Sequence, residues 1–172
     1  MQIVLIAAVS LDGKLARDAA HLSDWTSPED KAQFVRETRA AGVMIMGHNT
    51  YKTLKRPLPG RLHVVLTRQP EAEPGIPGAV EFTAAPPAAI VAGLAARGYT
   101  RAALVGGAQV NALFLAADLV DEIRLTVEPV IFGQGIGLFA GPPLERRATL
   151  LDLTPLNANA FMARYSLRPV SR

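Results

Sequence analysis

Residues 43–68 read VMIMGHNTYKTLKRPLPGRLHVVLTR, and this stretch decides the fold. It contains two apolar runs, 43–46 and 62–66, whose length and composition are typical of buried parallel strands. A polar segment with prolines and a glycine separates them. Because the carboxyl ends of neighbouring parallel strands meet at one edge of a sheet, we expect the residues after both runs to form one site.

The residues that follow the two runs suit an anionic ligand. Asn49 and Thr50 stand ahead of a helical turn, where free backbone N–H groups and the helix dipole favour phosphate. Arg68 follows the second run as a fixed positive charge. The alternative is that Asn49 and Thr50 only cap a helix and that Arg68 is a solvated strand end. The turn at 56–61, RPLPGR, presents Arg61 rigidly, which favours a negatively charged ligand.

Length and composition exclude several classes of protein. The 172 residues, 49% of them hydrophobic, are enough for a single domain over residues 1–172. The net charge of 18 − 15 = +3 is scattered, which argues against a nucleic-acid surface. The chain has no cysteine, and its three histidines lack metal-ligand spacing, so we expect no metal. The apolar start, 3–9, is too short to span a bilayer and resembles no leader, so we expect a cytoplasmic protein without membrane contact.

Strand-like runs and helix signals alternate along the first two thirds of the chain. The run 3–9 precedes a helix predicted over 28–41, which Ser27 caps. Two further helices are predicted at 87–97 and 109–117, each between apolar runs. This rhythm predicts an α/β fold with a mostly parallel central sheet and helices on both faces. From residue 122 the alternation is that of strands alone, which predicts an antiparallel C-terminal part.

Two glycine-rich segments follow strands. Gly106-Gly107 opens a predicted helix, so that a ligand could approach the backbone closely, although a tight strand-to-helix turn is the more common reason for such a pair. The segment 133–137, GQGIG, has no helix after it, and we interpret it as a structural bulge or an interface loop. We expect exposed apolar side chains there that suit a two-fold interface, namely Ile136, Leu138 and Phe139.

Seven motifs in this order resemble the dihydrofolate reductase superfamily, and within it the reductase domain of the riboflavin-biosynthesis deaminase-reductases. They are SLDGK (10–14), WTSPED (25–30), MGHNTY (46–51), RPLPGR (56–61), VLTR (65–68), VGGA (105–108) and VEPVIFGQGIGLF (127–139). The resemblance covers nearly the whole chain and implies a dihydrofolate-reductase-like three-layer sandwich. It also implies a homodimer that transfers hydride from NADPH to a pyrimidine- or pteridine-type substrate.

The resemblance places NADPH across three strand ends, with its nicotinamide near Ala7 and Ala8. The residues implied to bind the cofactor are Ala8, Gly47, His48, Asn49, Thr50, Leu66, Thr67, Arg68, Val105, Gly106, Gly107, Ala108, Gln109 and Val110. His48 and Gln109 stand where the folate enzymes usually carry basic residues for the 2′-phosphate. Arg68 is therefore the main expected partner of that phosphate.

The two branches of the superfamily imply different substrates. Asp30 and Thr126 match the acid and the hydroxyl of the folate enzymes, and Arg61 matches the arginine that holds the folate carboxylate. The motifs 10–14 and 129–139 look like the riboflavin branch instead. That branch often carries acids at two positions where this chain has Val105 and Lys55-Arg56. The residues implied to bind substrate are Ala7, Lys14, Trp25, Asp30, Phe34 and Arg61.

Hydride reduction of a C=N bond also needs a proton on nitrogen, which a buried acid with a raised pKa can supply. We expect Asp30, oriented by Thr126, to be this catalytic acid. The alternatives are that Asp30 only complements a helix dipole, that Lys14 is an exposed loop residue, and that Trp25 fills core.

Three functions remain open from the sequence. The first is a riboflavin-pathway reductase of a 5-amino-6-(5-phosphoribosylamino)uracil-like pyrimidine. The second is a dihydrofolate reductase. The third is a non-catalytic nucleotide-binding module that keeps the fold, since a fold does not fix a function.

Overall fold

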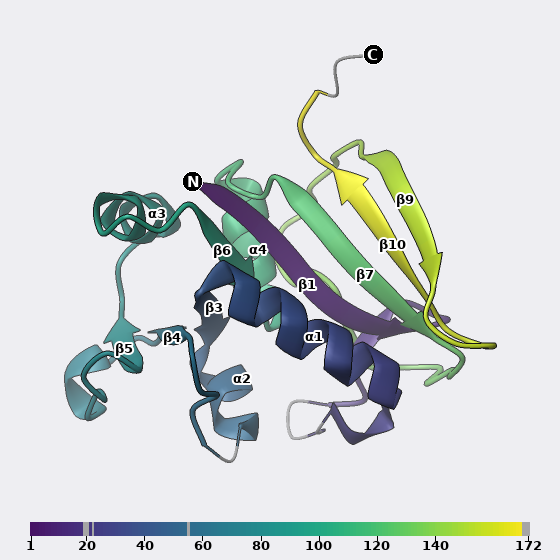
Figure 1. The fold of residues 1–172 in the computed structure, drawn as a ribbon, viewed down its shortest axis with the longest axis horizontal. Coiled ribbons are helices and arrows are strands. Elements are labelled where there is room, and N and C mark those ends of the chain that lie inside the picture. Colours follow the sequence, from purple (N-terminus) through teal and green to yellow (C-terminus); the bar gives the residue numbers. More distant parts are fainter. Residues whose placement is uncertain (19–20, 22, 55, 170–172) are drawn as a thin grey trace.

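The computed structural model describes residues 1–18, 21, 23–54 and 56–169, so Lys55 lies outside the described residues (Figure 1). An eight-stranded sheet has the order β5-β4-β3-β6-β1-β7-β10-β9. Its strands are β1 (Gln2–Ser10), β3 (Val43–Gly47), β4 (Leu62–Leu66), β5 (Val80–Thr83), β6 (Arg101–Leu104), β7 (Glu122–Glu128), β9 (Thr149–Pro155) and β10 (Phe161–Ser166). Two short strands, β2 (Lys14–Ala16) and β8 (Ile136–Gly137), pair separately.

The sheet is parallel from β5 to β7, and only β10 and β9 are antiparallel. The predicted mostly parallel sheet is confirmed. The antiparallel part was expected to begin at residue 122, and this detail is wrong, because β7 pairs with β1 in parallel, with Ala8 opposite Thr126. Strand periodicity does not reveal the direction of a strand.

Helices cover both faces of the sheet, which confirms the three layers (Figure 1). On one face, α1 (Pro28–Ala41) and α2 (His48–Thr53) contribute Phe34, Ala41 and Tyr51 to an apolar cluster with Met44 and Met46 of β3. On the other face lie α3 (Pro87–Ala96) and α4 (Ala108–Ala116). Two 3-10 turns, η1 (Ser23–Trp25) and η2 (Pro70–Ala72), complete the described helices. No helix in the described ranges has the length and apolar character that crossing a membrane requires.

Helix α1 begins and ends where the sequence predicts. The Ser27 side chain accepts a hydrogen bond from the backbone N–H of Asp30 at 3.2 Å, and Pro28 occupies the first turn. Gly42 ends the helix in the left-handed region, with φ of 73°.

Strand β7 turns its polar residues, not its apolar ones, toward helix α1. Glu122, Arg124, Thr126 and Glu128 are buried, and the residues between them are only half-buried. Arg124 pairs with Glu37 of α1 and, at 2.8 Å, with Glu122. Buried charges need partners of this kind, and α1 supplies one of them. The same face of β7 brings Thr126 to the first turn of α1.

The carboxylate of Asp12 joins two segments that are far apart in the sequence. It accepts hydrogen bonds from the Phe132 N–H at 3.1 Å and the Gly133 N–H at 2.9 Å. The hydrogen bond from Ser10 and those from the two amides lower the Asp12 pKa. These contacts fit the interpretation of the glycine-rich segment as structural.

The apolar side chains of that segment are less exposed than expected. Ile136 and Leu138 are half-buried, because Ile136 lies in β8 and Leu138 packs against the core. Only Phe139 is exposed, at 37%.

Candidate active site

Two turns at the carboxyl edge of the parallel strands are in direct contact. The backbone N–H of Gly47, at the end of β3, donates to the Gly106 carbonyl at 2.7 Å. A Cβ atom on Gly107 would lie 3.3 Å from Oγ1 of Thr50, so any larger residue at position 107 would crowd the Thr50 side chain. The peptide between Gly106 and Gly107 is cis. The structure therefore brings together the residues predicted on both turns.

The beginning of α4 offers its backbone rather than its side chains. Gly107 precedes the helix and supplies no capping side chain, so the N–H groups of the first turn are not capped by it. Ala108 and Val110 are buried, and Val110 Cγ2 would lie 3.1 Å from a Cβ atom on Gly47. Gln109 is exposed. Of these residues, only Gln109 presents a side chain to solvent.

The end of β4 lies next to the same turns. Leu66 pairs with Gly47, and the Thr67 N–H donates to the Thr83 carbonyl of β5 at 2.9 Å. Arg68, which follows, is exposed. Val105 is half-buried and donates its N–H to the Ile45 carbonyl at 2.9 Å. Three adjacent strand ends therefore form one continuous edge, as predicted from the sequence.

Asp30 lies in the first turn of α1, and its half-buried side chain is hydrogen-bonded to Thr126 of β7. Burial raises the pKa of its carboxyl group, hydrogen bonds with Thr126 and Thr26 lower it, and the charge of Glu128 raises it, with a net upward shift. Thr126 lies opposite Ala8 in the register of β7 and β1. The predicted acid, its hydroxyl partner and the expected nicotinamide position are therefore close together.

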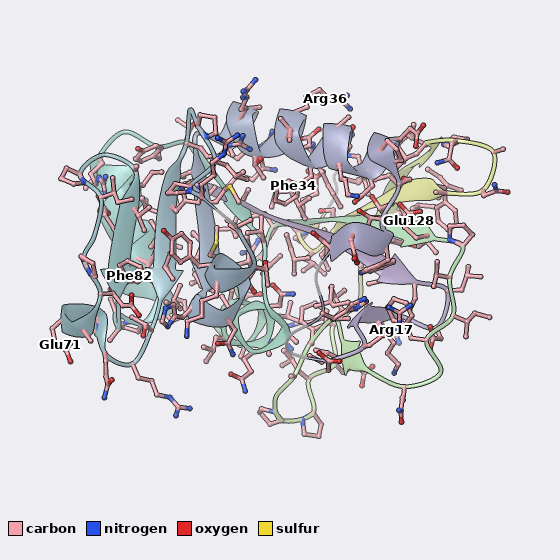
Figure 2. The ribbon with its side chains drawn as sticks, turned by 90° about the horizontal axis from the view of Figure 1, so that it is seen from below. Arg17, Phe34, Arg36, Glu71, Phe82 and Glu128 are labelled. Atoms are coloured by element: carbon pink, nitrogen blue, oxygen red, sulfur yellow. The ribbon has the colours of Figure 1, made fainter. Side chains whose placement is uncertain are left out.

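The Glu128 side chain connects β7 to the beginning of α1. Its Oε1 accepts hydrogen bonds from the Ser27 N–H at 2.8 Å and from the Ser27 hydroxyl at 2.7 Å. Figure 2 shows Glu128 near the beginning of α1, with Phe34 on the side of the helix that faces the sheet and Arg36 on the outward side. Phe34 lies one turn after Asp30, so both side chains reach the same region.

Arg61 lies at the opposite end of α1 from Asp30. Its guanidinium group is buried, donates to Thr38 Oγ1, and donates to the Pro59 carbonyl at 3.3 Å. Burial, and then the charge of Arg39, lower the Arg61 pKa. Because Thr38 lies eight positions after Asp30 in the helix, these two residues are about 12 Å apart along α1.

Two further predicted substrate residues lie between β1 and α1. Trp25 packs edge-to-face on Phe132, with ring centroids 5.0 Å apart, and stacks on His21 at 6.4 Å. Lys14 is half-buried at the start of β2, and its N–H donates to Ser10 Oγ at 2.9 Å. Their roles toward a substrate stay predictions.

Sequence reasoning did not identify three polar residues of this region. Thr26 and Glu128 contact Asp30 or its helix turn, and Glu73 lies 2.9 Å from the His48 ring. The polar alternation of β7 was a signal for Glu128 as well as for Thr126. Glu73 lies 25 residues beyond His48 in a loop, and no local pattern connects the two.

Comparison with solved structures shows the class of fold. Among solved structures, a putative riboflavin biosynthesis protein from Shewanella sp. PV-4 has a TM-score of 0.79 at 23% identity, covering 96% of this chain and 98% of that one. A diaminohydroxyphosphoribosylaminopyrimidine deaminase/5-amino-6-(5-phosphoribosylamino)uracil reductase from Thermotoga maritima has the same TM-score at 18% identity, covering 96% and 56%. These similarities define the class of fold, the dihydrofolate-reductase-like α/β sandwich.

Sequence comparison identifies the family. The dihydrofolate reductase family model matches residues 2–131, and the chain belongs to this family. The dihydrofolate reductase of Neisseria meningitidis serogroup A is 39% identical over 133 residues, which cover 74% of this chain and 76% of that protein. Members of this family are NADPH-dependent reductases.

Proposed function

We propose that the protein is an NADPH-dependent reductase that transfers hydride to a C=N bond of a pteridine or pyrimidine. One observation carries this proposal: Asp30, with a raised pKa, lies beside Thr126 and Ala8, at the edge of the sheet where the turns at Gly47 and Gly106-Gly107 meet. A raised pKa keeps a proton on the carboxyl group at higher pH, where the substrate nitrogen needs it.

The strand-end turns suit a dinucleotide. The close approach at Gly107 and the uncapped N–H groups of α4 favour a pyrophosphate, and Arg68 adds a positive charge nearby. Bound there, NADPH would supply the hydride. Thr126 and Thr26 would orient the Asp30 carboxyl group, and the Glu128–Ser27 contact would hold its helix turn in place.

Dihydrofolate is the substrate that the described side chains support better. In its ionised form the Asp30 side chain only accepts hydrogen bonds, so this form complements the two N–H donors of a 2-amino-4-oxo ring edge, whereas a uracil edge offers one donor next to a carbonyl oxygen. The protonated form is the one that donates to the substrate nitrogen. Arg61 donates to Thr38, which lies about 12 Å from Asp30 along α1, so its guanidinium group suits the carboxylate at the far end of a long substrate.

A riboflavin-pathway pyrimidine, 5-amino-6-(5-phosphoribosylamino)uracil, is the second candidate. The hydrogen bonds from the backbone of residues 132–133 to Asp12 favour this substrate, because they join the two motifs that resemble the riboflavin branch. In this case Lys14, in β2 next to that contact, would bind the substrate phosphate.

Steady-state kinetics of Asp30→Asn test the proposal. We expect kcat to fall about a hundredfold or more, which is the usual effect of removing a general acid, with the affinity for NADPH unchanged. In the unaltered protein, kcat should fall as the pH rises through the raised pKa of Asp30. Unchanged turnover in the variant would remove Asp30 from the mechanism. If NADPH is not oxidised in the presence of dihydrofolate, and not in the presence of the pyrimidine either, a non-catalytic module is favoured.

We also propose that the protein is a homodimer that uses strand β9. This strand forms the edge of the sheet, all seven of its residues are exposed, and Leu150, Leu151 and Leu153 are 53%, 42% and 56% exposed. An open edge with apolar side chains favours pairing with another strand, and antiparallel pairing of two β9 strands would satisfy two-fold symmetry.

A further inference from the structure

The His48 ring is paired with a carboxylate on the side of the candidate site where β4 and β5 end, which we call the outer end of the site. Nε2 of His48, the first residue of α2, lies 2.9 Å from Oε1 of Glu73, directly after η2. The two side chains are only 22% and 31% exposed. Phe82 of β5 contacts the His48 ring edge-to-face, with centroids 5.9 Å apart. The carboxylate is thus held in a fixed position.

This pair lies where the adenosine end of a dinucleotide would reach, an argument that rests on the proposed function. Asp30 and Ala8 fix the reacting end at β1, and the Gly47 and Gly107 turns fix the phosphates at β3 and β6. The remaining direction along the sheet edge leads to β4 and β5. From β1 to β4 there are three strand spacings, about 14 Å, which suits an extended dinucleotide.

A carboxylate and a 2′-phosphate are a poor match at this end. Sites that take a plain ribose hydrogen-bond its 2′-hydroxyl with an acidic residue, whereas sites that take the 2′-phosphate use a basic residue. This chain offers both kinds of residue, with Glu73 on His48 and Arg68 after β4. A like charge close to the phosphate opposes binding much more strongly than one that solvent screens.

We propose that Glu73 is the specificity-determining residue for the cofactor. Its carboxylate accepts a hydrogen bond from the ribose 2′-hydroxyl of NADH. Its negative charge weakens the binding of the NADPH 2′-phosphate by Arg68. The protein therefore binds both dinucleotides, with a smaller preference for NADPH than Arg68 alone would give.

Calorimetric binding of NADP⁺ and NAD⁺, without substrate or turnover, tests this proposal in Glu73→Gln and Glu71→Gln. Both changes remove one negative charge, but Glu71 is exposed on η2 and lies at the rim of the molecule (Figure 2). We expect Glu73→Gln to raise the ratio of NADP⁺ to NAD⁺ affinity about tenfold and Glu71→Gln to change it less than about twofold, because solvent screens distant charges. Glu73→Arg should raise the ratio further.

The outcomes separate this inference from the proposed function. If the unaltered protein binds both dinucleotides and Glu73→Gln leaves the ratio unchanged, or shifts it no more than Glu71→Gln does, the role of Glu73 is refuted and the reductase proposal stands. If the unaltered protein binds neither dinucleotide, the cofactor site is wrong and the role of Glu73 is refuted with it.

Discussion

Ser27→Ala should destabilise the protein, because the Ser27 side chain makes two contacts that position Asp30. Its oxygen caps α1 by accepting from the Asp30 N–H at 3.2 Å, and its hydroxyl donates to buried Glu128 at 2.7 Å. Loss of the cap costs about 1 kcal/mol. Loss of the hydrogen bond to a carboxylate costs about 1.5 kcal/mol, the lower end of the usual range, because Ser27 is half-buried. We therefore expect a decrease of about 2.5 kcal/mol in the free energy of unfolding.

Thermal and urea denaturation measure this change. For a chain of 172 residues, the melting temperature should fall by about 5 to 10 °C. Ser23→Ala is the matched control, because Ser23 is an exposed serine four residues earlier, and it should change the unfolding free energy by less than about 0.5 kcal/mol. A decrease below about 0.5 kcal/mol for Ser27→Ala, or equal decreases in both variants, would refute the energetic role assigned to the Ser27 contacts.

Two other predictions concern β7 and β9. Burial by itself would raise the Glu122 pKa, but hydrogen bonds from Arg164 and Arg124 lower it below its ordinary value. This carboxylate therefore stabilises the fold at neutral pH, and the stabilisation is lost as the pH falls through the lowered pKa. In urea unfolding, Glu122→Gln should lose less stability than the unaltered protein between pH 7 and about pH 3, and equal losses would contradict the assignment. Leu153→Arg should convert the proposed dimer to a monomer in sedimentation analysis. Leu113→Arg, at a 52% exposed position on α4, is the control and should leave the dimer intact. A dimer in both variants, or a monomeric unaltered protein, would contradict an interface at β9.

Local signals in the sequence were sufficient for most elements of the fold. Ser27, Pro28 and Gly42 mark the ends of α1, and the two apolar runs of 43–68 become β3 and β4 with the parallel pairing that their composition predicts. Both depend on interactions within a few residues or on burial on two faces, which composition reports directly.

The candidate site was accessible to sequence reasoning only in part. The turns at Gly47 and Gly106-Gly107 end apolar strands, and parallel strands place their ends together, so their meeting followed from the pattern. The contacts of Glu128 with Ser27 and of Glu73 with His48 join residues 101 and 25 positions apart, and no local preference encodes such pairs.

The sequence by itself therefore determined most of the elements, their order along the chain and the edge of the sheet at which the site lies, because backbone preferences and burial act locally. Tertiary structure decided the direction of β7, the burial of its polar face under α1, and the pairing of a carboxylate with His48. The physical reason is that the pKa of Asp30 and the charge at the outer end of the site depend on distances between elements, and only the packed fold sets those distances.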